Sequence, residues 1–104
     1  MSENLERLSI LEQNLSTIIS QKQQYNKQLM EIESAFTELK TTNEAFKIVG
    51  TIMIKKSSDS IKKDLEERKS LVKARLDSLD KQEIQLRKQV EELQSIVMKE
   101  LDQE

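Results

Sequence analysis

The chain contains almost none of the residues that make turns. Its 104 residues include one glycine, Gly50, and no proline. Turns usually depend on Gly, Pro or clusters of Asn and Asp, so this chain has few places at which it can reverse direction. We therefore predict two long uninterrupted segments on either side of Gly50. A composition rich in Leu, Lys, Glu, Gln and Ser indicates that both are helices with narrow apolar seams.

The first segment has an apolar repeat of seven residues. Only Lys22 interrupts it, over about five heptads, which predicts a coiled-coil helix from about residue 3 to about residue 41. A single amphipathic helix on a globular core is the alternative, but a two-position stripe is too narrow and too long for that role. The two columns are Leu8, Leu15, Lys22, Leu29 and Phe36, and Leu11, Ile18, Tyr25, Ile32 and Leu39.

The second segment is predicted to be a helix from about residue 58 to about residue 102. Ser57 or Ser58 can cap its start, and Asp59 then lies near the positive end of the helix dipole. The seam is weak at first and strengthens toward the C-terminus. Its columns are Leu65, Val72, Leu79, Leu86 and Leu93, and Lys62, Lys69, Leu76, Glu83, Val90 and Val97.

Two helices of similar length with a short connection are expected to fold back as an antiparallel pair within a single domain, residues 1–104. With the reversal at Gly50, Leu15 should lie near Leu86. Lys22 and Glu83 should then fall about one turn apart across the seam. They either form a polar layer that fixes the register, as single polar seam residues can, or Lys22 extends its charged end outward into solvent.

Residues 45–56, AFKIVGTIMIKK, differ from both helices because β-branched residues are dense and Gly50 lies at their centre. They predict a β-hairpin with its turn near residues 49–51. We expect Phe46, Ile48, Ile52 and Ile54 to alternate with Lys47, Thr51 and Lys55, while Val49 and Met53 add apolar area to the second face.

A lone hairpin is marginally stable in water and has two free edges. We therefore expect hairpins of several chains to pair into a shared sheet or barrel, rather than to form a local β-turn without an oligomeric role. The residues predicted to mediate this assembly are Phe46, Ile48, Val49, Gly50, Ile52, Met53 and Ile54.

Several apolar residues lie off the seam at the end of the coiled coil that carries both termini. Ile10, Ile96, Met98 and Leu101 have no place in an ordinary solvated surface of this kind, although isolated exposed apolar residues are common in proteins. Helix ends open readily, and Met adapts to many partners. The predicted binding surface comprises Leu5, Leu8, Ile10, Leu11, Ile96, Val97, Met98 and Leu101.

Several functional classes are disfavoured. The chain has no Cys and no His, which removes thiolate metal sites, redox motifs and imidazole bases, so we expect no metal, no cofactor and no enzyme. Acidic and basic residues are interleaved and the net charge is −2, which disfavours a nucleic-acid-binding arm. No apolar run of membrane-spanning length is present, and the N-terminus does not resemble a secretory signal, so we expect no membrane contact and a cytoplasmic location.

The chain resembles the β-type subunit of prefoldin over its whole length. The segments that carry the resemblance are FKIVGTIMIKK between the two helices and RLDSLDKQEIQLRKQVEEL in the second helix. The resemblance implies a hexamer of two α-type and four β-type subunits on a double β-barrel platform. It also implies an ATP-independent chaperone whose coiled-coil tips hold non-native polypeptides and pass them to a group II chaperonin. The alternative is a structural coiled-coil spacer that assembles through its hairpin.

Overall fold

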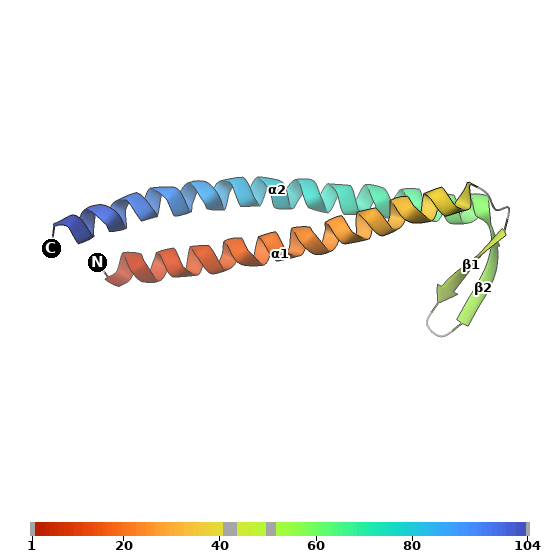
Figure 1. The fold of residues 1–104 in the computed structure, drawn as a ribbon, viewed down its shortest axis with the longest axis horizontal. Helices are drawn as coiled ribbons and strands as arrows, with labels where there is room; N and C mark the ends of the chain where they lie inside the picture. Colours follow the sequence, from red (N-terminus) through yellow and green to blue (C-terminus); the bar gives the residue numbers. More distant parts are fainter. Residues whose placement is uncertain (1, 41–43, 50–51, 104) are drawn as a thin grey trace. The chain divides into compact units, whose positions relative to one another are not determined.

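The computed structural model describes residues 2–40, 44–49 and 52–103. Helix α1 (Ser2–Leu39) is followed by strands β1 (Glu44–Val49) and β2 (Ile52–Ser57) and by helix α2 (Ser58–Asp102) (Figure 1). The predicted order of helix, hairpin and helix is therefore confirmed. Helix α1 ends at Leu39 rather than at about residue 41, and β2 continues to Ser57. The predicted turn residues Gly50 and Thr51 lie outside the described residues.

The chain divides into two compact units. We call Met1–Gln24 with Leu76–Glu104 the terminal unit, because it contains both ends of the chain, and Tyr25–Arg75 the central unit, because it contains the hairpin. In each unit a part of α1 packs against a part of α2.

The seam of each unit consists of the residues that the heptad pattern predicts. Among the residues whose burial the structure describes, all eight buried apolar residues occupy the predicted columns, and each is at most 9% exposed. Because these columns repeat every seven residues, they stay on the side of each helix that faces its partner. They are Ile18, Leu79, Val90, Leu93 and Val97 in the terminal unit, and Ile32, Leu39 and Val72 in the central unit.

The two helices are antiparallel within each unit. In the terminal unit Asn4 Nδ2 donates a hydrogen bond to Glu100 Oε1 at 2.6 Å. In the central unit Arg75 Nη1 donates to the Tyr25 hydroxyl at 3.4 Å, and the Lys69 ammonium lies 5.9 Å from the centre of the Phe36 ring. These pairs fit a register that is nearly symmetrical about the middle of the chain.

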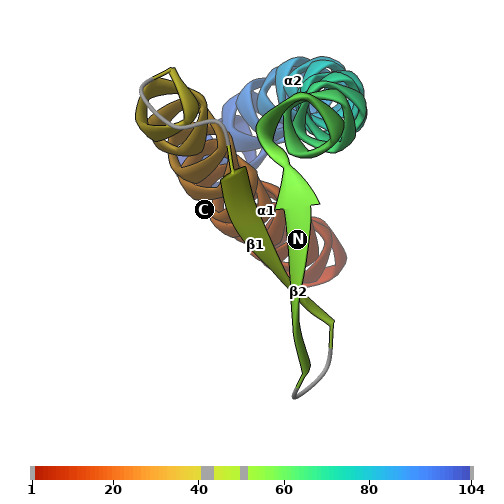
Figure 2. The ribbon, with the colours of Figure 1, turned by 90° about the vertical axis from the view of Figure 1, so that its right-hand side faces the viewer.

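The hairpin is a two-stranded antiparallel sheet in which β1 and β2 lie side by side (Figure 2). Position 48 pairs with Met53, and position 49 pairs with Ile52. Directly opposed residues share a face of a sheet, and neighbours along a strand alternate between faces.

The prediction that Phe46, Ile48, Ile52 and Ile54 share one face is therefore wrong. Positions 46 and 48 share a face with Lys55 and Met53, whereas Ile52 and Ile54 share the other face with positions 49 and 47. The physical reason is the register of the two strands. Two residues separate β1 from β2, so each even-numbered position on β1 lies opposite an odd-numbered position on β2. Each face consequently carries both apolar residues and lysine.

A serine caps α2 at the end of the hairpin. The Ser57 hydroxyl accepts a hydrogen bond from the backbone N–H of Ser60 at 3.2 Å, as an N-cap does, and Asp59 lies in the first turn. Of the two predicted capping residues, Ser57 is the one that caps. Among the described residues, no helix combines the length and the apolar character needed to cross a membrane.

Candidate functional site

The terminal unit exposes large apolar side chains outside its seam. Met98 is 61% exposed, Ile10 57%, Ile96 and Leu101 46%, and Leu5 42%. None of these residues belongs to the heptad columns, so none of them is part of the seam. All five lie within ten residues of an end of the described chain, and burying such side chains against a ligand would be favourable.

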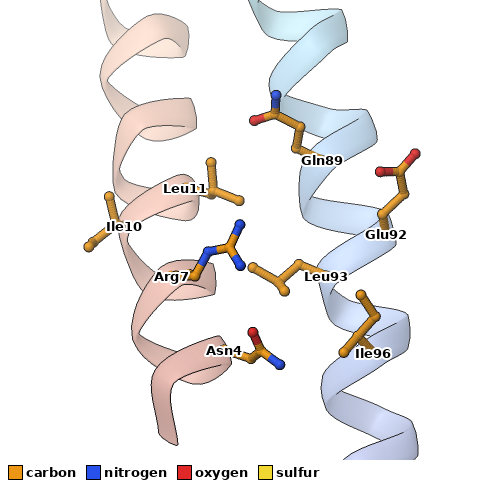
Figure 3. A pocket seen from close by; sticks show the side chains of 8 residues that line it. All are labelled: Asn4, Arg7, Ile10, Leu11, Gln89, Glu92, Leu93 and Ile96. Carbon is orange, nitrogen blue, oxygen red and sulfur yellow. The ribbon is translucent and has the colours of Figure 1, made fainter. Parts of the chain in front are cut away.

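An open groove of about 450 Å³ runs between the two helices of this unit. Figure 3 shows Leu11 and Leu93 directed toward the space between the helices, with Arg7 reaching across from α1, whereas Ile10 points to the outer side of α1. The groove thus has an apolar floor and a mixed rim. Its lining residues are Asn4, Arg7, Ile10, Leu11, Gln89, Glu92, Leu93 and Ile96.

The structure separates the residues predicted to form the binding surface. Ile10, Leu11 and Ile96 line this groove, whereas Leu5, Leu8, Met98 and Leu101 are not among its lining residues. Leu8 and Leu11 are half-buried, and Val97 is only 5% exposed. Val97 is therefore a seam residue here, and a ligand could reach it only if the helix ends opened.

A polar pair closes the seam near the chain ends, and sequence analysis missed it. Asn4 and Glu100 form the hydrogen bond described above, and Glu100 Oε2 is buried with no partner among the described residues. A signal was available, because stepping one further heptad from Leu11 and from Leu93 reaches Asn4 and Glu100. Polar groups therefore replace leucine in this layer of the seam.

Lys22 and Glu83 meet in the seam of the terminal unit. The Lys22 ammonium lies 3.2 Å from Glu83 Oε1 and 2.6 Å from Asp80 Oδ1, and Arg87 Nε donates to Glu83 Oε2 at 3.1 Å. The predicted cross-seam contact therefore exists, with Asp80 and Arg87 as additional members. Lys22 donates hydrogen bonds to Asp80 and to Glu83, and these bonds raise the pKa of Lys22, the one to Asp80 most. Glu83 accepts hydrogen bonds from Arg87 and from Lys22, and these bonds lower the pKa of Glu83, the one from Arg87 most.

These shifts predict how stability depends on pH. Glu83 contributes fully above its ordinary pKa of 4.5 and loses its contribution as the pH falls through the lowered value, while Lys22 contributes below 10.5 and loses its contribution at higher pH. Glu83→Gln should therefore lower the melting temperature at pH 7, and its difference from wild type should shrink as the pH falls below 4.5 and through the lowered pKa of Glu83. Circular dichroism melting curves measure this. Glu91→Gln, an exposed site on the same helix, is the control, and a difference that did not change with pH would contradict the assignment.

The hairpin carries the residues that were predicted to mediate subunit assembly. Ile52 is 65% exposed, Met53 62% and Ile54 41%. Consecutive positions on β2 alternate between the two faces, so apolar groups are exposed on both. The sheet has two strands, and each has one edge without a partner strand in the described chain. Of the other predicted residues, only the backbone pairing of positions 46, 48 and 49 is described, and Gly50 lies outside the described residues.

The sequence profile of the prefoldin subunit family matches residues 2–104. The chain belongs to the prefoldin family. It is 38% identical to the prefoldin subunit beta of Caldivirga maquilingensis over 97 residues, which cover 90% of this chain and 80% of that protein. It is 31% identical to the prefoldin subunit beta of Sulfolobus acidocaldarius over 96 residues, which cover 89% of this chain and 77% of that one.

A crystal structure gives the same assignment for the fold. The prefoldin beta subunit from Thermococcus strain KS-1 superimposes with a TM-score of 0.87 at 27% identity, covering 96% of this chain and 90% of that one. The resemblance found in the sequence is thus confirmed, and this chain is a prefoldin chaperone subunit. Prefoldin is a family of chaperones rather than of enzymes.

Proposed function

We propose that this prefoldin subunit holds non-native polypeptides without using ATP, keeps them from aggregating, and delivers them to a group II chaperonin. The observation that carries the proposal is the set of exposed apolar side chains in the terminal unit: Leu5, Ile10, Ile96, Met98 and Leu101. Unfolded chains expose apolar side chains that native proteins bury. An apolar, adaptable surface therefore favours non-native clients over native ones.

One coiled coil of this kind offers only a few contacts. Each apolar side chain buried against a client contributes about 1.5–3 kcal/mol before the cost of association is subtracted. We propose that the hairpins join this chain to other subunits in a hexamer of two α-type and four β-type subunits, so that several coiled coils hold one client together. Multivalency would then raise the effective concentration and turn weak contacts into firm holding.

The competing function is a structural spacer, in which the helices only set a distance. A spacer requires the seam and the hairpin but has no use for exposed apolar groups near the chain ends. The two functions therefore differ in whether these groups can become polar without loss of activity.

The test replaces Ile10, Ile96 and Met98 with glutamine, which suits a helix but removes the apolar surface. In the assembly with an α-type subunit and without nucleotide, this variant should lose most of its ability to suppress aggregation of a denatured protein, requiring about tenfold more chaperone. Light scattering during dilution from denaturant measures it.

The matched control replaces Met30, Leu71 and Ile84 with glutamine. These side chains are also more than half exposed, at 70%, 55% and 67%, but lie farther from the chain ends in the sequence. The control should protect the client as well as the wild type does. Equal protection by the test variant would support the spacer instead.

A further inference from the structure

A second groove in the terminal unit has a different chemistry. It is open, has a volume of about 620 Å³, and shares Gln89 with the apolar groove. Side chains with amide groups make up most of its lining. The lining residues are Asn14, Thr17, Ile18 and Gln21 from α1, and Lys81, Gln82, Gln85, Leu86 and Gln89 from α2.

The heptad pattern explains how these amides gather. Asn14 and Gln21 on α1, and Gln82 and Gln89 on α2, occupy the position that directly precedes a seam column. In an antiparallel pair these positions of both helices flank the same side of the seam. All four side chains are exposed, so their amide groups are accessible above the half-buried Leu86 and the buried Ile18.

The groove is nearly free of charge. Residues 13–21 of α1, QNLSTIISQ, include no charged residue. Among the described residues, Lys81 is the one charged residue that lines the groove. A third groove of this unit, lined by Glu12, Leu15, Arg87, Val90, Glu91 and Gln94, carries three charged residues. Amides therefore predominate in the second groove, whereas charged residues make up half of the lining of the third.

Neutral amides over an apolar floor match one kind of ligand. Each Gln or Asn side chain donates and accepts hydrogen bonds, as a peptide group does. An extended, unfolded segment presents unpaired main-chain N–H and C=O groups that a native protein has already satisfied. Peptide groups carry no net charge, so an uncharged lining complements them, whereas a nucleic acid would require a row of cations.

We propose that this amide-lined groove binds the main chain of an extended segment of non-native polypeptide, with Ile18 and Leu86 beneath its side chains. The inference rests on the proposed function and adds a second mode of recognition to it. Apolar contacts in the neighbouring groove select exposed side chains. The amides recognise backbone independently of sequence, and Gln89 lines both grooves.

The experiment replaces Gln21, Gln85 and Gln89 with methionine, which keeps the length of the side chain and removes its hydrogen-bonding amide. Binding of reduced, carboxymethylated α-lactalbumin, a permanently unfolded protein, is measured by titration with the assembled chaperone. Loss of three hydrogen bonds should weaken binding about tenfold. The control replaces the exposed Gln13, Gln23 and Gln94, which lie outside this groove, with methionine and should bind like the wild type.

The outcomes separate the possible occupants. Unchanged or tighter binding by the Gln21, Gln85 and Gln89 variant would show that the groove acts only as apolar surface, which overturns the inference. A change in its sedimentation without a change in client affinity would show a contact between subunits and would also overturn it. If the variant with Ile10, Ile96 and Met98 replaced by glutamine loses binding but the methionine variant does not, the proposed function stands and this inference fails. If the wild-type assembly did not bind the unfolded protein, both the proposed function and this inference would be refuted.

Discussion

Replacing Ile52 and Ile54 with lysine is expected to dissociate the assembly and leave both helices folded. The two residues lie on the same face of the hairpin, and they are 65% and 41% exposed in the single chain. If other subunits cover this face, each substitution removes about 1.5 kcal/mol or more of favourable apolar burial and also places a charge in the interface. Together these losses should weaken association at least 100-fold.

Analytical ultracentrifugation of the chain mixed with an α-type subunit measures this, and circular dichroism checks the helices. The control introduces the same substitutions at exposed helix positions, Met30→Lys with Leu71→Lys, and should assemble normally. An unchanged sedimentation profile of the hairpin variant would refute the assembly role.

Shortening one seam leucine should destabilise the protein strongly. Leu79 is 7% exposed, and Leu→Ala at a buried site costs about 2–5 kcal/mol, because apolar burial is lost and a cavity remains. Leu71 lies on the same helix but is 55% exposed, so Leu71→Ala should change stability by less than about 0.5 kcal/mol.

Urea unfolding followed by circular dichroism gives both values. Both variants and the wild type must be compared at equal protein concentration, because assembly adds to the apparent stability. Similar costs at Leu71 and Leu79 would mean that the helices do not pack through the predicted columns in solution.

The helices and their seam could be predicted because they follow from a periodic signal. Once one residue of a heptad column is placed, every later member faces the same way, so Ile18, Leu79 and Val97 could all be assigned to the seam from the sequence. The same periodicity also predicted that Lys22 lies close to Glu83. Both residues occupy seam columns, one on each helix, and they carry opposite charges. Whether this contact fixes the register stays a prediction.

The sequence did not predict which residues share a face of the hairpin. This depends on whether the loop between the strands contains an even or an odd number of residues. Shifting the register of a strand by one residue exchanges the face of every residue on it. The prediction that Ile52 and Ile54 share a face is confirmed. Whether positions 46 and 48 share that face depends on the length of the turn, which Gly50 alone does not specify.

The two grooves of the terminal unit could not be predicted either, since they depend on which side chains meet across the helices. Ile10 and Ile96 were chosen because they were apolar and lay outside the seam, and both line one groove. In the sequence, Gln85 and Gln89 are indistinguishable from ordinary solvent-exposed helix residues. Only the structure shows that Asn14 and Gln21 of α1 line the same groove. Asp80 was missed as a partner of Lys22 for the same reason.

The central claim is that non-native polypeptide is bound by the exposed apolar residues near the chain ends. Its most direct test is site-specific photo-crosslinking, with p-benzoylphenylalanine placed singly at Ile10, Ile96 or Met98 and, for comparison, at Met30 or Ile84. All five side chains are exposed, so the probe is equally accessible to solvent at each site. We predict strong crosslinks to denatured client, and none to its native form, from the first three positions, with little from the other two. Equal crosslinking from all five positions, or stronger crosslinking from Met30 and Ile84, would contradict the claim.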